Sequence, residues 1–463
     1  MNKFKNSRQL LFFTWLITIS FLALLLAFIM GASFFRHIST GGNKLPKAIE
    51  SVVDTLALVP SLVKLAAIEI QDHITGKPSS LLIPNGKIKK ANWVHKFPAP
   101  EDDGYLLLAG VTAAENQSIV QLIRIADGQV IAKWIPDWID IHKKITSHRF
   151  AQSGSTKNYR AIHPLLLSDG SLIFNTSSSL ARLPLCSSKP FWVLNYPYHH
   201  SIELSPEGHS VWVPSVTEAF AIFSPMLKHK LRDDSLSEVS LNGQVIQNLS
   251  FSKILADNNM TSHMLGTSGL KVNLDPIHIN QITPAPSDSP YWQKNDLLIS
   301  ARHRSTVYLY RPSTGKIIWY QQGPWINQHS SHFVNQHAIV VFGNDVYGFK
   351  NQSLFIHEES HNQIYQFDFK TNLTQKLRSE SLNDIKPRTF TEGRVQLLED
   401  KSIFIEETNN ARLFKLNSKG QLVWSYINTY DANNLGIVSW SRYLTKKELH
   451  ATVNIEKMEC FKN

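Results

Sequence analysis

The stretch DLLISARHRSTVYLYRPSTGKIIWY, Asp296 to Tyr320, contains short apolar segments separated by turn residues. Aromatic and β-branched residues fill these segments, which is typical of β-strands. Gly315 lies in the second turn, where a tight hairpin needs a residue that tolerates a positive φ. The stretch therefore predicts antiparallel strands joined by short turns.

The same arrangement recurs six times after Trp93. The clearest segment of each unit is its second strand: YLLLAG after Gly104, SLIFNT after Gly170, SVWVPS after His209, DLLISA after Asn295, AIVVFG after His337 and SIFIEE after Lys401. The hairpins that follow turn near residues 128, 188, 243, 315, 372 and 420. Six four-stranded units are hard to pack as a sandwich, whereas a ring of six radial blades buries both faces of each sheet. The sequence predicts an all-β, six-bladed β-propeller, with a two-domain β arrangement as the alternative.

The N-terminal region contains a long apolar run. Leu10 to Phe35 contains no charged residue and exceeds the roughly 20 residues that cross a bilayer. The basic segment MNKFKNSR precedes it, which favours a cytoplasmic N-terminus. We expect residues 1–36 to form a cytoplasmic N-terminus and a single-pass transmembrane helix in the inner membrane, with the remainder on the periplasmic side. A signal peptide cleaved near Gly31-Ala32-Ser33 is the alternative.

Three further segments complete the expected organisation. Residues 37–90 are predicted to form a helical stalk or linker, because apolar residues between Lys47 and Gly76 keep near-helical spacing. The propeller is expected over residues 91–445, and a tail over residues 446–463.

The composition limits the partners. Among 463 residues, 47 Lys and Arg exceed 37 Asp and Glu, but the basic residues form no dense run, so no nucleic-acid partner is expected. Cys186 and Cys460 allow at most one disulfide, and no CxxC motif indicates a zinc ribbon.

Histidines recur at the starts of the expected inner strands, which line the channel of a propeller. HHSIEL, HINQI and HSSHF place His200, His278 and His329 in three successive units, and SARHR brings Arg302 toward the same mouth. IHPLLL places His163 similarly in the second unit. Three imidazoles and a guanidinium can bind a tetrahedral anion, and a neutral imidazole among them can act as a nucleophile. Three histidines can also bind zinc, but the guanidinium would repel a cation, so no metal is expected.

At these residues the chain resembles the PAPS-independent arylsulfate sulfotransferases, the bacterial arylsulfotransferase family. The resemblance covers roughly Asn92 to Tyr443, and its most specific part is the ordered set HHSIELSPEG, DPIHINQI, LLISARHRSTVYLYRPSTGKIIW and GPWINQH. It implies a six-bladed propeller that moves a sulfuryl group from a phenolic sulfate ester to a phenolic or other hydroxyl acceptor through a sulfohistidine. No cofactor is implied, and the chain contains no GxxxxGK[ST] loop that would indicate a nucleotide donor.

The resemblance also implies roles for individual residues. His329 is expected to carry the sulfuryl group, while His200, His278 and Arg302 bind the sulfonate oxygens, stabilise charge and move the phenol proton. His199, His332 and Arg304 are rivals for the roles of His200, His329 and Arg302.

Other residues are expected to bind or pack. We expect Asn280 and Arg304 to contact substrate, and Trp325, like Trp292, to stack on its aromatic ring from a loop near the mouth. Trp134, Trp319 and Trp424 are expected to pack between blades. The alternative function is a non-catalytic propeller that binds an anionic ligand or a partner protein at the channel mouth.

Overall fold

The computed structural model describes residues 66–84, 97–145, 156–185, 187–218, 232–265, 275–349, 352–355 and 361–454, together with residues 15, 18–23 and 31. The chain divides into two compact units. The first consists of residues 1–67 and 267–272, and its described residues are helical. The second, residues 68–266 and 273–463, contains all of the described strands.

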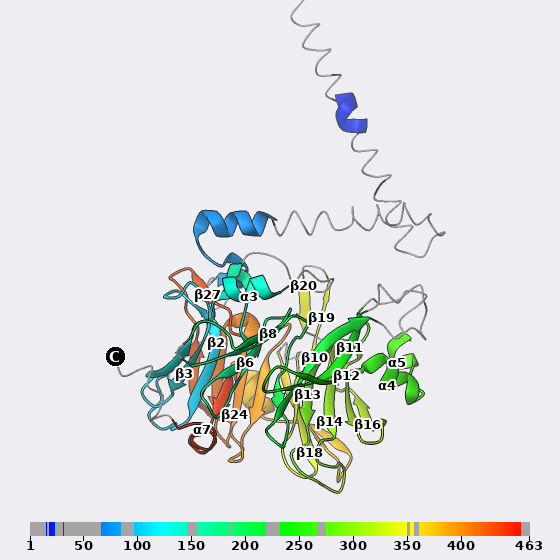
Figure 1. Ribbon diagram of the computed structural model, residues 1–463. Helices are drawn as coiled ribbons and strands as arrows, with labels where there is room; N and C mark the ends of the chain where they lie inside the picture. The colour runs from blue at the N-terminus through cyan, green and yellow to red at the C-terminus, as the bar shows by residue number, and fades with distance from the viewer. Residues whose placement is uncertain are drawn as a thin grey trace, which may run out of the picture. The chain divides into compact units, whose positions relative to one another are not determined.

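The described part of the second unit contains six four-stranded antiparallel sheets (Figure 1). Blade 1 contains β28 (Arg442–Leu444), β2 (Tyr105–Thr112), β3 (Gln117–Arg124) and β4 (Val130–Trp134), and blade 2 contains β5 (Ile162–Leu166), β6 (Leu172–Asn175), β7 (Leu180–Leu183) and β8 (Trp192–Leu194). Blade 3 contains β9 (Glu203–Leu204), β10 (Ser210–Glu218), β11 (Arg232–Ser240) and β12 (Val245–Ser250), and blade 4 contains β13 (Ile279–Pro284), β14 (Leu297–Ala301), β15 (Thr306–Arg311) and β16 (Lys316–Gln322). Blade 5 contains β17 (His329–Phe333), β18 (Ala338–Gly343), β21 (Gln363–Asp368) and β22 (Leu373–Lys376), and blade 6 contains β23 (Arg394–Leu397), β24 (Ile403–Glu407), β25 (Arg412–Leu416) and β26 (Leu422–Ile427). The predicted all-β, six-bladed propeller is confirmed, as are all six predicted second strands.

Shorter elements connect or flank the blades. They are β1 (Leu82–Pro84), which pairs with β27 (Asn434–Gly436), the hairpin of β19 (Val346–Phe349) and β20 (Gln352–Phe355), and the helices α3 (Trp138–Lys144), α4 (Phe251–Asp257), α5 (Ser262–Leu265), α6 (Ser379–Ile385) and α7 (Lys446–Thr452). In Figure 1, α3 and β27 lie at the upper end of the propeller and α7 at its lower end.

The hydrophobic core is divided into clusters between successive blades. Leu106 and Leu108 of β2 pack toward blade 6, whereas Leu107 and Ala109 pack toward blade 2. Successive residues of a strand point to opposite faces, so an uninterrupted apolar strand fills two clusters at once. Each fully buried leucine contributes about 1.5–3 kcal/mol, and this packing holds the ring of blades together.

The C-terminal strand closes the ring. Arg442 to Leu444 of β28 pair with Tyr105 to Leu107 of β2, so the inner strand of blade 1 comes from the end of the propeller sequence. This strand was not predicted from the sequence. The first part of the predicted tail packs against the propeller, because Leu449 of α7 lies in the core between blades 1 and 2.

Several predictions fall on the N-terminal region. The transmembrane helix of residues 1–36 lies largely outside the described residues, and no helix within the described part of the chain is long and apolar enough to cross a membrane. Residues 66–75 are helical, as expected, but residues 82–84 of the predicted stalk form β1 in the propeller unit. Cys186 and Cys460 also lie outside the described residues.

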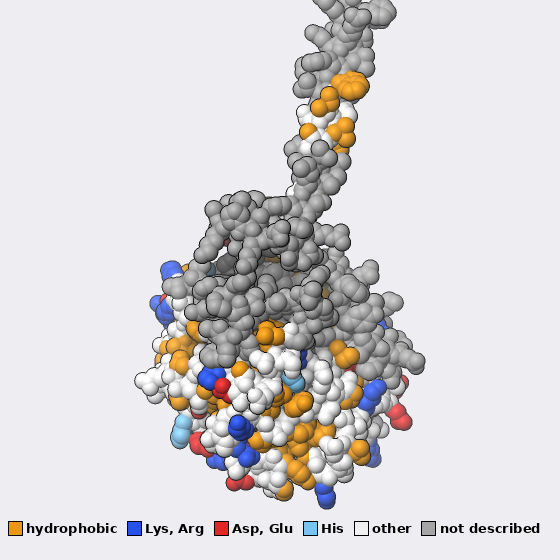
Figure 2. Space-filling model, turned by 90° about the vertical axis from the view of Figure 1, so that its right-hand side faces the viewer, with side chains coloured by type: hydrophobic (Ala, Val, Ile, Leu, Met, Phe, Trp, Pro, Cys, Tyr) orange, Lys and Arg blue, Asp and Glu red, His pale blue; other side chains and the backbone are white. Residues whose placement is uncertain are grey.

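The tryptophans predicted to pack between blades do so, and the face drawn in Figure 2 is not dominated by one sign of charge. Trp134 and Trp424 are buried between blades, and Trp319 packs partly buried against the cluster between blades 4 and 5, as predicted. On the face drawn in Figure 2, Lys and Arg side chains are scattered among acidic and uncharged groups.

Candidate functional site

A cavity of about 310 Å³ lies at the end of the channel where the inner strands begin. We call it the first cavity. Its lining includes the four predicted residues His200, His278, Arg302 and His329, and also His199, Arg232, Trp440 and the ion pair of Arg160 with Glu392. Residues from blades 1 to 6 therefore meet around one space, as the repeat predicted for the histidines.

The backbone turns sharply where the lining residues enter the inner strands. His200, His278 and Trp440 have φ angles of 59°, 56° and 60°. A positive φ costs a residue other than glycine on the order of 1–3 kcal/mol and persists only where the surrounding structure enforces it, often at functional sites. Register shifts in β13 and β17 lie beside the same positions. Such bulges re-aim side chains, here toward the channel.

Three imidazole rings surround the interior of the first cavity. The ring centroid of His200 lies 5.2 Å from that of His278 and 6.0 Å from that of His329. The indole of Trp440 lies 5.8 Å from both His200 and His329 and forms one wall. A group held between these rings is within reach of all three imidazoles.

The hydrogen bond of His329 determines which of its nitrogens is free. Asn344 donates through Nδ2 to the carbonyls of Thr389 and Glu392, so its Oδ1 faces Nδ1 of His329 at 2.6 Å. Nδ1 must therefore carry the proton, and Nε2 keeps its lone pair. Burial, with a smaller effect of the charge on Arg302, lowers the pKa of His329 well below its usual value. His329 is neutral at pH 7 and has an unprotonated Nε2.

A chain of contacts likewise fixes the tautomer of His200. The guanidinium of Arg232 donates to Nε2 of His199 at 3.0 Å. Asp234 lies 3.4 Å from the same nitrogen, but the guanidinium is closer and can only donate, so Nε2 of His199 is an acceptor. His199 then donates through Nδ1 to Nδ1 of His200, 2.7 Å away. This leaves Nε2–H of His200 as a donor for a ligand.

His278 is paired with a carboxylate. Its Nδ1 lies 2.6 Å from Oδ2 of Asp275. Burial raises the pKa of Asp275, but the hydrogen bond and the charge from His278 outweigh burial and lower it below the usual value. Asp275 is therefore ionised and accepts a hydrogen bond from Nδ1–H of His278, while Nε2 of His278 remains to give or take a proton.

Among the described residues, one cluster of potential metal ligands is close enough to hold a metal ion, and Asp275 belongs to it. The cluster consists of Asp275, His278 and His303. Nδ1 of His303 lies 2.7 Å from the carbonyl of Asp275, and Nε of Arg232 lies 3.5 Å from the carboxylate. A metal ion would have to displace these hydrogen bonds beside a guanidinium. The donor set fits a hydrogen-bonded acid–base pair better than a metal site.

Arg302 supplies the positive charge of the first cavity. It follows β14, and its backbone N–H donates to the carbonyl of His278 at 3.0 Å. Among the described residues its guanidinium makes no hydrogen bond or ion pair, whereas Arg160 and Arg232 are paired with carboxylates. Burial lowers the pKa of Arg302 and Asp275 opposes this shift. A partly buried guanidinium with no acceptor among the described residues is suited to bind a sulfonate.

The three residues predicted to bind substrate lie outside the first cavity. Trp325 is fully buried in the core between blades 4 and 5, as is Trp292, so neither can stack on a substrate at the mouth. Arg304 donates to the carbonyl of Met264 at 2.8 Å. Asn280 is buried and donates to the carbonyl of Gln328 at 2.7 Å, which places it behind the backbone that leads to His329.

The rival histidines are also separated. His199 lines the first cavity beside His200, but its nitrogens are engaged by His200 and Arg232. His332 lines a different cavity, on the far side of His329. His163 is fully buried and accepts a hydrogen bond from the backbone of Ile202.

Sequence reasoning missed the residues that position the predicted ones. Asp275 precedes His278 by three residues in DPIHIN, and this spacing was the one available signal. Asn344 follows β18 and Arg232 begins β11, so each reaches the site through strand pairing within its own blade. Trp440 precedes β28 and reaches the site through the closure of the ring.

Comparisons with known proteins give one family and several solved structures. Residues 163–429 match the sequence model of a family described as arylsulfotransferase (ASST). A search of curated proteins found no match. Among solved structures, a protein of unknown function from Bacteroides caccae is 13% identical over 74% of this chain and 99% of that chain, with a TM-score of 0.45. Virginiamycin B lyase from Staphylococcus aureus is 10% identical over 71% of this chain and 86% of that chain, with a TM-score of 0.35.

Proposed function

This chain belongs to the arylsulfotransferase family, and on that premise we propose that it moves a sulfuryl group from an aryl sulfate ester to a phenolic or other hydroxyl acceptor through a sulfohistidine, without a nucleotide donor. The observation that carries the proposal is that one cavity contains both His329, neutral and held through Nδ1, and the guanidinium of Arg302, which has no partner among the described residues. This arrangement supplies a nucleophile and an anion-binding group at the same place.

In the first half-reaction, Nε2 of His329 attacks the sulfur of the aryl sulfate. The S–O bond to the phenol breaks as the N–S bond forms, and the leaving phenolate takes a proton from Nε2 of His278. Asp275 stabilises the protonated form of His278 through Nδ1. Oδ1 of Asn344 accepts a hydrogen bond from Nδ1–H of His329 throughout, which stabilises the positive ring of the sulfohistidine.

In the second half-reaction, the hydroxyl oxygen of the acceptor attacks the sulfur of the sulfohistidine. Its proton passes to His278, the N–S bond breaks, and the electron pair returns to Nε2 of His329. Arg302 and Nε2–H of His200 hold the sulfonate oxygens in both steps. Donors placed in advance around a transferred group stabilise the transition state more than the same groups in water would.

The test of this function is transfer of sulfuryl groups from a chromogenic aryl sulfate to phenol. His329→Asn should abolish transfer, and Arg302→Ala should lose about 3 kcal/mol of transition-state stabilisation, roughly a hundredfold in rate. His209→Asn, at an exposed position, serves as the matched control. Transfer by His329→Asn at the wild-type rate would exclude His329 as the nucleophile.

A folded wild-type chain that binds the aryl sulfate and transfers nothing would instead support the alternative, a non-catalytic binding propeller. Activity that a chelator removes would indicate a metal-dependent hydrolase.

We also propose that residues 1–36 anchor the protein in the inner membrane and leave the propeller in the periplasm. The uncharged run from Leu10 to Phe35, preceded by a basic segment, supports this orientation. Protease added to intact spheroplasts should degrade the propeller, and protection of the propeller would reject the orientation.

A further inference from the structure

A second cavity, of about 870 Å³, lies on the other side of the histidine layer. Strand β17 contributes residues to both cavities. His329 lines the first cavity, and Ser330 and His332 line the second. Gln281, Arg394 and Arg442 also line it, and its outer part is formed by residues that include Lys447 of α7. The second cavity therefore opens at the end of the propeller that carries α7 (Figure 1).

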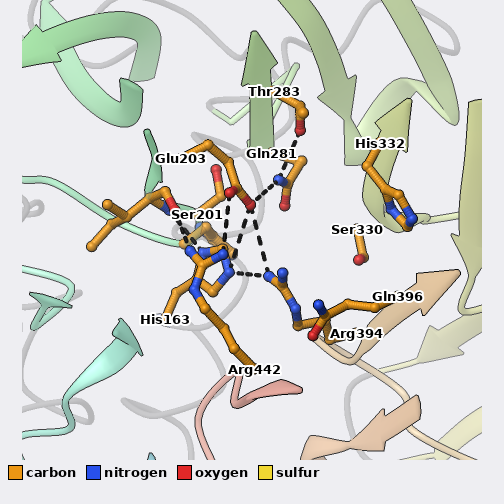
Figure 3. Close-up of polar contacts among 12 residues, drawn as sticks. His163, Ser201, Glu203, Gln281, Thr283, Ser330, His332, Arg394, Gln396 and Arg442 are labelled. Atoms are coloured by element: carbon orange, nitrogen blue, oxygen red, sulfur yellow. Dashed lines mark hydrogen bonds and ion pairs between the residues drawn. The ribbon is translucent and has the colours of Figure 1, made fainter. Parts of the chain in front are cut away.

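Glu203 is the centre of a buried group of charges in this cavity. In Figure 3, dashed lines join Glu203 to Gln281, Arg394 and Arg442. Arg442 is fully engaged, because it also donates to the carbonyls of Pro164 and Ile202. Glu203 thus neutralises one guanidinium, and two guanidiniums are present.

Arg394 is the guanidinium whose donors are not all used. Its Nη1 contacts Nε2 of His163 and lies 3.8 Å from Glu203, but its Nε and Nη2 make no hydrogen bond among the described residues. The residue is only 6% exposed. Burial, with a smaller effect of the charge on Arg442, lowers the pKa of Arg394 to about 9, so the group is still charged at pH 7. A buried charge with unused donors is costly unless an anion accepts from it.

Gln281 has an unused hydrogen-bond acceptor, whereas Arg394 has unused donors. Its Nε2 donates to the carboxylate of Glu203 and to the hydroxyl of Thr283, both at 3.0 Å, which fixes the orientation of the amide. Its Oε1 is buried and has no hydrogen-bond partner. An acceptor in this position needs a donor.

The outer part of the cavity restricts the charge of a ligand. It carries the exposed carboxylates Glu101, Asp103, Glu399, Asp400 and Glu448. These groups repel polyanions, so an anion of low charge is favoured at the inner end.

We propose that the second cavity binds a small oxyanion that also carries a hydroxyl group, of which hydrogen phosphate is the simplest example. The oxyanion accepts hydrogen bonds from Arg394, and the hydroxyl group donates to Oε1 of Gln281. Sulfate, which has no hydroxyl group at neutral pH, binds more weakly. This site does not depend on the proposed function, because it contains none of the four residues of the first cavity.

The test is calorimetric titration of the full-length chain with inorganic phosphate and, separately, with inorganic sulfate. Arg302→Gln removes the anion-binding group of the first cavity, and one phosphate should still bind to this variant, more tightly than sulfate. Adding Arg394→Gln should weaken phosphate binding at least about tenfold, since a charge-assisted hydrogen bond is lost. Adding Lys447→Gln instead, which removes a charge from the outer part, should change it less than about twofold.

No phosphate binding to the Arg302→Gln variant, or equal binding with and without Arg394, would overturn the proposal. Gln281→Leu gives a second criterion that leaves every charge in place. It should weaken phosphate binding and leave sulfate binding unchanged, and equal effects on both anions would reject the role of the hydroxyl group. If the Arg394 variant does not fold, diffraction from crystals of the wild-type chain grown in phosphate decides, because phosphate must then lie beside Arg394.

Discussion

At the scale of single residues, the site depends on groups that fix tautomers. The sequence predicted that His200, His278, Arg302 and His329 converge, because their position in the repeat determines where each one lies. It did not predict the partner of each ring. Asn344 and Arg232 come from other strands or loops of the blades, and the three-residue spacing in DPIHIN does not by itself show that Asp275 meets its histidine. The expected role of Trp325 was wrong for a related reason: a loop tryptophan looks accessible in sequence, but this one fills the core between two blades.

Substitution of Asn344 tests whether the fixed tautomer of His329 matters for activity. Asn344→Leu removes the acceptor for Nδ1–H while retaining the volume of the side chain, so the ring loses its fixed orientation. We expect kcat for sulfuryl transfer to fall about a hundredfold, as for other small misplacements of a reacting group, with little change in KM for the donor.

Asn344→Asp distinguishes positioning from a purely structural role. The carboxylate accepts a hydrogen bond from the same Nδ1–H and should restore part of the rate. Because its charge also stabilises the imidazolium, it raises the pKa of His329, and the acid limb of the pH profile should move to higher pH. A rate in Asn344→Leu close to that of the wild type would show that the tautomer does not need to be fixed.

At the scale of elements, the second strands and hairpins were predictable because both faces of each blade are buried and their apolar runs are long. The inner strand of blade 1 was not, because β28 has only the three residues Arg442 to Leu444 and its partner β2 lies at the other end of the chain. The pairing of β1 with β27 escaped prediction for the same reason. Short strands with distant partners leave little periodicity to detect.

A buried network stabilises the closing strand. The hydroxyl of Tyr443 donates to Asp102 at 2.7 Å and accepts from Lys415 at 2.8 Å, and Trp424 also donates to Asp102. Tyr443→Phe should lower the free energy of unfolding by about 1–3 kcal/mol, the cost of leaving buried groups without a partner. Urea denaturation measures this change, with Tyr320→Phe on the exposed outer strand β16 as control. Equal stability of the two variants would show that the network does not hold the closure.

At the scale of the whole molecule, the histidines around the channel are buried or partly buried, and neutral. Burial is the main cause that lowers the pKa of His199, His303 and His332 to about 4 each. Their pKa in the unfolded chain is near 6.5, so the unfolded state binds more protons below that pH. The stability they provide is complete above pH 6.5 and is lost as the pH falls toward 4.

The free energy of unfolding should therefore fall between pH 7 and pH 5. The three histidines account for a loss on the order of 5 kcal/mol, offset by about 1 kcal/mol from Asp233, whose pKa burial raises to about 6. Urea denaturation at the two pH values measures the difference. His332→Gln should reduce the loss by about 2 kcal/mol, because the amide does not titrate. Equal stability of the wild type at pH 7 and pH 5 would contradict the neutral, buried state of these rings.

The proposed reaction requires that His329 carries the sulfuryl group within the first cavity. The most direct test is to mix the full-length chain with an aryl sulfate in the absence of an acceptor, quench, and locate the modified residue by peptide mass spectrometry. We expect one sulfuryl adduct, on His329, that disappears when phenol is added before the quench. An adduct on another residue, or turnover with no adduct at any time, would contradict it.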